Sequence, residues 1–123
     1  MLDGRRIIVV EDNPIVALDL EFILSGAGAE VIGPFHAIPT MCESRPDAAI
    51  LDVELDGCTV FPFAERLRAR GVPIVFHTGY WDTDAIRHRF PHAFLRRKPS
   101  LPEDLLDALE AVMAAGGPIR HHA

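Results

Sequence analysis

The sequence predicts an α/β domain with a doubly wound, five-stranded parallel sheet in the order 2-1-3-4-5 and five helices. Three observations lead to this expectation. Short apolar runs alternate with longer amphipathic stretches, as in repeated strand-helix units. Glycine, proline and small polar residues separate the runs from the stretches. At 123 residues, 49% of them hydrophobic, residues 1–123 suit one domain, with an ordered part expected at about 4–116 and a short C-terminal tail.

Five apolar runs account for the five expected strands. The first and third are the clearest, because residues 7–10 and 48–51 are continuously apolar, as in strands that are buried on both faces of a parallel sheet. The run nearest the C-terminus is weaker. The expected strands cover residues 5–10, 31–34, 48–52, 73–77 and 93–97.

The first helix is marked at both ends. Asn13 is the expected N-cap and Pro14 the first helical residue, and Gly26 and Gly28 end the helix. Its apolar residues fall on two neighbouring stripes at helical spacing. One stripe contains Ile15, Leu18 and Phe22, and the other contains Val16, Leu20 and Ile23.

Four further helices are expected after the second, third, fourth and fifth strands. The first of them must be short because Pro46 follows it, and the next tolerates Pro62 only in its first turn. The last begins at a capping box formed by Ser100 and Glu103. The four helices cover residues 38–44, 59–70, 83–89 and from this capping box to Gly116-Gly117-Pro118.

Composition and charge exclude several classes of protein. A net charge of −6 argues against a nucleic-acid partner, which requires a basic surface. No apolar stretch approaches the roughly 20 residues that cross a bilayer, and the N-terminus does not have the pattern of a signal peptide. Cys42 and Cys58 form no disulfide framework. We therefore expect a soluble cytoplasmic protein that binds neither nucleic acid nor a membrane.

Acidic side chains follow two of the expected strands. Glu11 and Asp12 close the first and Asp52 closes the third, and these strands are neighbours in the expected order. Ligands of such sheets bind beyond the carboxyl ends of the strands, so the three carboxylates are expected to meet there. Each one alone has an ordinary explanation, since acidic residues also cap helices and form turns. Together they suit Mg²⁺ or Mn²⁺.

The expected roles of these acids differ. Asp52 is the expected phosphoryl acceptor because it ends the central strand, and a carboxylate can act as the nucleophile that becomes an aspartyl phosphate. Asp12 is expected to bind the metal directly, Glu11 through water, and Glu54 through its backbone carbonyl.

Two residues from the remaining strands complete the expected site. Thr78 closes the fourth strand and Lys98 the fifth, and both are expected to contact the phosphoryl group. Taken singly, Thr78 is more often a helix cap and Lys98 a solvated side chain. The Lys98-Pro99 bond is also a candidate cis peptide, because only the bond before proline adopts that form cheaply.

With Glu11-Asp12, Asp52, Thr78 and Lys98-Pro99 in this order and at near-family spacing, the chain resembles the receiver domain of response regulators. This is the CheY-like, flavodoxin-like module of two-component signalling, and the resemblance covers essentially the whole chain. It implies phosphotransfer to Asp52 from a sensor histidine kinase or a histidine phosphotransferase, dependence on Mg²⁺, and slow self-dephosphorylation. It also implies that phosphorylation controls the binding of a downstream protein.

A narrower resemblance involves the fourth strand. Residues 76–80 are similar to the Phe-Ala-Thr-Gly-Tyr motif of the FAT GUY receivers, with His77 in place of alanine. That subgroup implies a kinase of the HWE or a related type. Leu95 stands where most receivers have an aromatic switch residue, and we hypothesise that Tyr80 replaces it. Glu54 occupies a position that commonly tunes the phosphoryl lifetime in receivers.

The expected function is that of a stand-alone response regulator that switches partner binding and is not an effector enzyme. One alternative is a phosphate shuttle or sink, which has the same site and differs only in reverse phosphotransfer. Another is a phosphorylation-independent protein-interaction module, against which the intact acidic set argues. A flavin or nucleotide protein has less support, because no glycine-rich phosphate loop follows the first strand.

Overall fold

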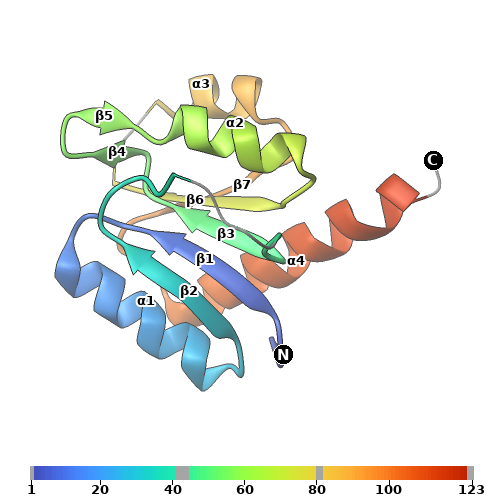
Figure 1. Ribbon diagram of the computed structural model, residues 1–123, viewed down its shortest axis with the longest axis horizontal. Coiled ribbons are helices and arrows are strands. Elements are labelled where there is room, and N and C mark those ends of the chain that lie inside the picture. Colours follow the sequence, from blue (N-terminus) through green and yellow to red (C-terminus); the bar gives the residue numbers. More distant parts are fainter. Residues whose placement is uncertain (1, 41–44, 80–81, 122–123) are drawn as a thin grey trace.

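A parallel sheet of five strands forms the centre of the computed structural model, which describes residues 2–40, 45–79 and 82–121, with side chains as far as residue 115. The strands lie in the order β2-β1-β3-β6-β7 (Figure 1). In chain order this is the predicted arrangement 2-1-3-4-5, which is thereby confirmed. The bounds are Arg6–Val10 for β1, Glu30–Phe35 for β2, Ala48–Leu51 for β3, Ile74–Thr78 for β6 and Phe94–Arg97 for β7.

Helices cover both faces of the sheet, with α1 and α4 on one face and α2 and α3 on the other (Figure 1). Alternate strand residues feed the two cores, since Ile8 and Val10 face α2 while Ile7 and Val9 face α1 and α4. The described residues contain four helices: α1 at Pro14–Gly26, α2 at Phe61–Ala69, α3 at Thr83–Arg89 and α4 at Pro102–His121.

The helix that was expected at 38–44 is not found in the described part of that segment. Residues 36–40 and 45–47 are not helical, and 41–44 lie outside the described residues. Pro39 accounts for this, because a proline disfavours the helical conformation of the residue before it.

The rotation of α1 about its axis leaves one of its two apolar stripes in solvent. The side chain of Asn13 accepts from the backbone N–H groups of Ile15 and Val16, as expected of an N-cap. The side chains that pack on the sheet are Ala17, Leu20 and Leu24. The apolar α1 stripe, which consists of Ile15, Leu18 and Phe22, is 79%, 67% and 79% exposed.

A small hairpin between β3 and α2 was not anticipated. Strand β4 (Glu54–Leu55) pairs with β5 (Cys58–Thr59), and the turn between them has positive φ at Asp56 and Gly57, 46° and 90°. The Asp-Gly pair is the usual sequence signal for such a turn. Because Thr59 is in β5, α2 begins at Phe61 and not at residue 59, with Pro62 in its first turn as expected.

The two ends of α4 differ from the prediction. The helix begins at Pro102, and the hydroxyl of Ser100 bonds to His77 and not to a helical N–H group, so the expected capping box is wrong. The helix also continues to His121, past the predicted end at Gly116-Gly117-Pro118. Extending an existing helix costs far less than starting one, and Pro118 removes only one donor.

None of the described helices is long and apolar enough to cross a membrane.

Candidate phosphoacceptor and metal site

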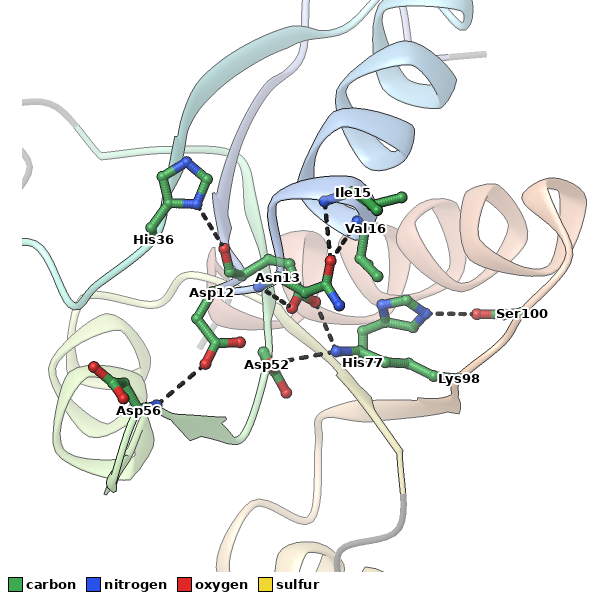
Figure 2. A network of polar contacts seen from close by, with 11 residues as sticks. Asp12, Asn13, Ile15, Val16, His36, Asp52, Asp56, His77, Lys98 and Ser100 are labelled. Atoms are coloured by element: carbon green, nitrogen blue, oxygen red, sulfur yellow. Dashed lines mark hydrogen bonds and ion pairs between the residues drawn. The ribbon is translucent and has the colours of Figure 1, made fainter.

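Three carboxylates meet beyond the carboxyl ends of β1 and β3. These strands pair with Val10 opposite Leu51, so Glu11 and Asp12 follow one strand where Asp52 follows the other. One carboxylate oxygen from each of the three residues lies within 4.8 Å of the others. Figure 2 shows Asp12 and Asp52 on the same side of this edge. The parallel register thus assembles the acidic cluster that the sequence predicted.

Neighbouring backbone fixes Glu11 in its buried position, where it is 1% exposed. Its N–H donates to the Phe35 carbonyl of β2 at 2.8 Å, and a ring nitrogen of His36 lies 3.3 Å from its carbonyl oxygen. The side-chain Oε2 accepts from the N–H of Asn13 at 3.1 Å. Glu11 therefore has little freedom to turn away from the other two carboxylates.

Lys98 supplies the positive charge of the site. Its Nζ lies 2.8 Å from Glu11 Oε1 and 3.2 Å from Asp52 Oδ2 (Figure 2). The ion pair compensates the burial of Glu11 Oε1, which has no other partner among the described residues. The Lys98 N–H donates to the Thr78 carbonyl at 2.8 Å, which extends the pairing of β6 and β7 to the site. The Lys98-Pro99 bond is cis, as predicted, and so is the Gly33-Pro34 bond.

The protonation of Asp52 reflects this crowding. Burial and then the nearby charge of Glu11 raise the pKa of Asp52 to about 7, although Lys98 opposes both. Burial alone would lower the pKa of Lys98, but the combined effect of the Glu11 and Asp52 carboxylates is larger, so the pKa is raised. At neutral pH the site holds more negative charge than one ammonium balances. An added cation would favour the ionised form of Asp52.

Asp12 and the β4–β5 hairpin form the more open side of the cluster. Asp12 is half-buried, and its Oδ2 accepts from the N–H of Asp56 at 3.1 Å (Figure 2). Glu54 begins β4, two residues beyond Asp52, and its side chain is exposed. The three carboxylates are hard oxygen donors of the kind that suits a divalent cation such as Mg²⁺.

The other predicted residues are placed as follows. Thr78 is the last residue of β6 and is buried beside the site. Leu95 lies in β7 opposite Phe76 and packs against the core. Tyr80 lies outside the described residues.

A contact that the sequence did not predict joins His77 to Ser100. The imidazole Nε2 lies 2.8 Å from the Ser100 hydroxyl, and the ring is buried between β6 and the start of α4 (Figure 2). Burial, and then the charge of Lys98, lowers the pKa of His77 to about 4, so the imidazole is neutral. No spacing rule relates the two residues, which are 23 positions apart.

A separate cavity of about 450 Å³ lies at the opposite end of β6 and β7. Its walls are mostly apolar and include Val72, Pro73, Phe94 and Val112. None of the acidic residues lines it, so the candidate chemistry belongs to the carboxyl ends of the strands.

Comparisons with known proteins identify the family of the chain. No family model matches the chain. The phyllosphere-induced regulator PhyR of Methylorubrum extorquens is 33% identical over 109 residues, which are 83% of this chain and 41% of PhyR. The DNA-binding response regulator MtrA of Mycolicibacterium smegmatis is 41% identical over 83 residues, 64% of this chain and 36% of MtrA. The chain thus spans about two fifths of the length of these curated relatives.

Solved structures extend the match to the whole fold. A putative response regulator from Chloroflexus aurantiacus has a TM-score of 0.75 and 28% identity, and the match covers 91% of this chain and 99% of that one. The chain is a receiver domain of the response-regulator family. Membership of the receiver in the FAT GUY subgroup stays a prediction.

Proposed function

We propose that this receiver accepts a phosphoryl group on Asp52, with Mg²⁺ held by the acidic cluster, and that the modification switches the binding of a partner protein. The observation that carries the proposal is the position of the Asp52 carboxylate. It lies 3.2 Å from the Lys98 Nζ, and one of its oxygens is within 4.8 Å of a carboxylate oxygen of both Glu11 and Asp12. We further propose that the receiver acts in the cytoplasm, with neither nucleic acid nor membrane as its partner, and has no catalytic activity beyond phosphotransfer and self-dephosphorylation.

The chemistry that we propose is an in-line displacement. A carboxylate oxygen of Asp52 attacks the phosphorus of a phosphohistidine, the P–N bond breaks, and the imidazole leaves in neutral form because its other nitrogen carries a proton. A bound Mg²⁺ would neutralise charge on the phosphoryl oxygens. Asp12 would hold it directly, Glu11 through water and Glu54 through its carbonyl. Lys98 pairs with the transferred group, and the Thr78 hydroxyl donates to it.

A direct test uses a small phosphodonor, which needs no partner protein. The receiver is incubated with acetyl phosphate and Mg²⁺, and the added phosphoryl group is measured by mass spectrometry of the intact protein. We expect modification of the native chain, none of Asp52→Asn, and none after chelation of the metal. Asp107→Asn, which replaces an exposed carboxylate on α4, is the matched control and should be modified normally. Equal modification of Asp52→Asn would exclude Asp52 as the acceptor.

The phosphodonor protein must bring its histidine to Asp52, so it must contact surfaces that flank the site. The apolar α1 stripe is such a surface, because α1 begins directly after Glu11 and Asp12. An apolar patch at a helix surface is typical of a protein-binding site. We propose that a histidine kinase, of the HWE or a related type, or a histidine phosphotransferase docks there through a helix of its own.

The output side of the switch lies near α3. Ile86 is the one buried residue of this helix, and Arg89 at its end pairs with Glu65 and lies over the Phe61 ring of α2. Because a single buried side chain holds the helix on the core, its displacement would expose little apolar surface. A phosphoryl group adds about 1.5 to 2 negative charges, which attract Thr78 and Lys98. We propose that α3 and Tyr80 respond to this change. Tyr80→Ala should then be phosphorylated normally but bind the phosphorylation-dependent partner less tightly, and unchanged affinity would refute a role for Tyr80.

A further inference from the structure

We propose that His77 is a positioning residue of this receiver, whose bond to Ser100 fixes the loop that carries Lys98 and so holds the ammonium against Asp52. The inference rests on the proposed function for its effect on phosphorylation, but its structural part does not. His77 stands where the Phe-Ala-Thr-Gly-Tyr motif, which residues 76–80 otherwise resemble, has alanine.

The loop between β7 and α4 is short, and β6 holds it at two points. Residues 98–101 connect Arg97, the end of β7, to Pro102, the start of α4. One anchor is the backbone bond from the Lys98 N–H to the Thr78 carbonyl at 2.8 Å. The other is the contact of 2.8 Å between His77 Nε2 and Ser100 Oγ. Adjacent residues of one strand thus secure the loop on both sides of Pro99.

The position of Lys98 depends on this loop because the ammonium serves two acceptors at once. Its Nζ must stay 2.8 Å from Glu11 Oε1 and 3.2 Å from Asp52 Oδ2. A lysine side chain has four rotatable bonds, so a loop that shifts or widens allows many arrangements in which one contact is lost. Figure 2 shows the His77 ring beside the Lys98 side chain, with Ser100 on its far side.

Core stability alone does not explain a histidine at this position. The ring is 4% exposed, and its Nδ1 is buried without a hydrogen-bond partner among the described residues. Burying an unpaired polar atom costs free energy, and an apolar side chain of similar size would avoid that cost. The one polar contact that the ring makes among the described residues is the bond to Ser100, so the bond is what distinguishes His77 from a packing residue. The neutral imidazole also adds no charge that would repel Lys98.

The test reads Lys98 directly, because Lys98 is the only lysine in the chain. In protein labelled with ¹⁵N-lysine, the side-chain Nζ resonance therefore comes from this residue alone. We expect His77→Leu and Ser100→Ala to move it toward the position of a solvated lysine. His77→Gln should keep it near the native position, because the Gln amide can still bond to Ser100. His92→Leu and Ser25→Ala, which change exposed residues, are the matched controls.

Phosphorylation by acetyl phosphate supplies a second measurement. His77→Leu and Ser100→Ala should each lower the rate about threefold to tenfold, the range that corresponds to the loss of one ordinary hydrogen bond. The double variant should be no slower than the single variants, because both remove the same bond. His77→Gln should recover most of the native rate.

The outcomes separate this inference from the proposed function. A Lys98 resonance that stays native in Ser100→Ala and His77→Leu, or rate losses that multiply in the double variant, would overturn the positioning role. If the native chain takes up no phosphoryl group, the proposed function fails, and the Lys98 spectrum still decides the inference. Ser100→Ala removes only a loop hydroxyl, so it carries the test if His77→Leu does not fold.

Discussion

Replacing Asp52 with asparagine should stabilise the metal-free receiver, and the gain should depend on pH. The amide resembles the protonated carboxyl group and removes the repulsion between Asp52 and Glu11. The fold raises the pKa of Asp52 from its ordinary value of 3.8 to about 7, so the folded state binds the proton more tightly than the unfolded state does. The stability that protonated Asp52 contributes is therefore fully present below about pH 4 and is lost as the pH rises through 7.

The size of the effect follows from the two pKa values. At 1.36 kcal/mol for each tenfold change in proton affinity, a rise from 3.8 to about 7 corresponds to about 4 kcal/mol. Relaxation of the site around a charged carboxylate lowers the penalty, so we expect Asp52→Asn to gain about 2–4 kcal/mol at pH 8. The gain should be roughly half as large near pH 5.4, midway between the two pKa values, and nearly absent below pH 4.

The assay is urea unfolding followed by far-ultraviolet circular dichroism, with a chelator present, at several values from pH 3.5 to 8.5. Asp107→Asn, on the exposed face of α4, controls for the loss of one carboxylate in general. Added Mg²⁺ should stabilise the native chain at pH 8 more than Asp52→Asn, because the metal offsets the same repulsion. A native chain as stable as Asp52→Asn at pH 8, or a difference that does not change with pH, would refute the reasoning.

Three further predictions concern the charge, the docking surface and the core. Lys98→Met should slow phosphorylation by acetyl phosphate at least tenfold, measured as the initial rate of mass change, because the transferred phosphoryl group loses a charge-assisted hydrogen bond worth about 1.5–3 kcal/mol. An unchanged rate would contradict the role of the ammonium. Leu18→Asp should slow phosphotransfer from a cognate kinase while leaving the acetyl phosphate rate unchanged, and equal loss with both donors would show damage to the site instead. Ala111→Asp, on the exposed face of α4, is its control. Phe90→Ala should destabilise the fold by about 3–5 kcal/mol in urea unfolding. The reason is that the centroid of the Phe90 ring lies 5.1 Å from that of Phe76 and 5.7 Å from that of Phe61. A loss below about 1 kcal/mol would mean that neighbouring side chains refill the space.

The sequence was sufficient to predict the acidic cluster because it shows where the strands end. The apolar runs before Glu11 and Asp52 end abruptly, and parallel neighbours bring their carboxyl ends to one edge, so the meeting of these side chains followed from topology. The position of Lys98 at the same edge was predicted by the same reasoning, because Lys98 directly follows β7.

Features that depend on packing or on side-chain rotation were not predictable. Apolar residues lie on more than one side of α1, so the pattern did not determine that Leu20 is buried and Leu18 exposed. The Asp56-Gly57 turn was readable but was obscured by the helical pattern that follows it. Ser100 had the spacing of a helix cap, and only the three-dimensional proximity of His77 shows that its hydroxyl is used elsewhere.

The choice of lysine as the cation that pairs with Glu11 and Asp52 is itself informative. Of the 12 basic residues in the chain, 11 are arginines, and the one lysine is Lys98. An arginine would offer a planar fork that matches one carboxylate, whereas an ammonium is a compact charge that can face two oxygens from different residues and then turn to a third. Lys98 faces Glu11 and Asp52 in this way, while an exposed cation such as Arg68 pairs with Glu65 and lies over a phenyl ring. Under the proposed function the cation would pass from a carboxylate to a phosphoryl oxygen, and that movement favours the point charge of a lysine over the fixed fork of an arginine.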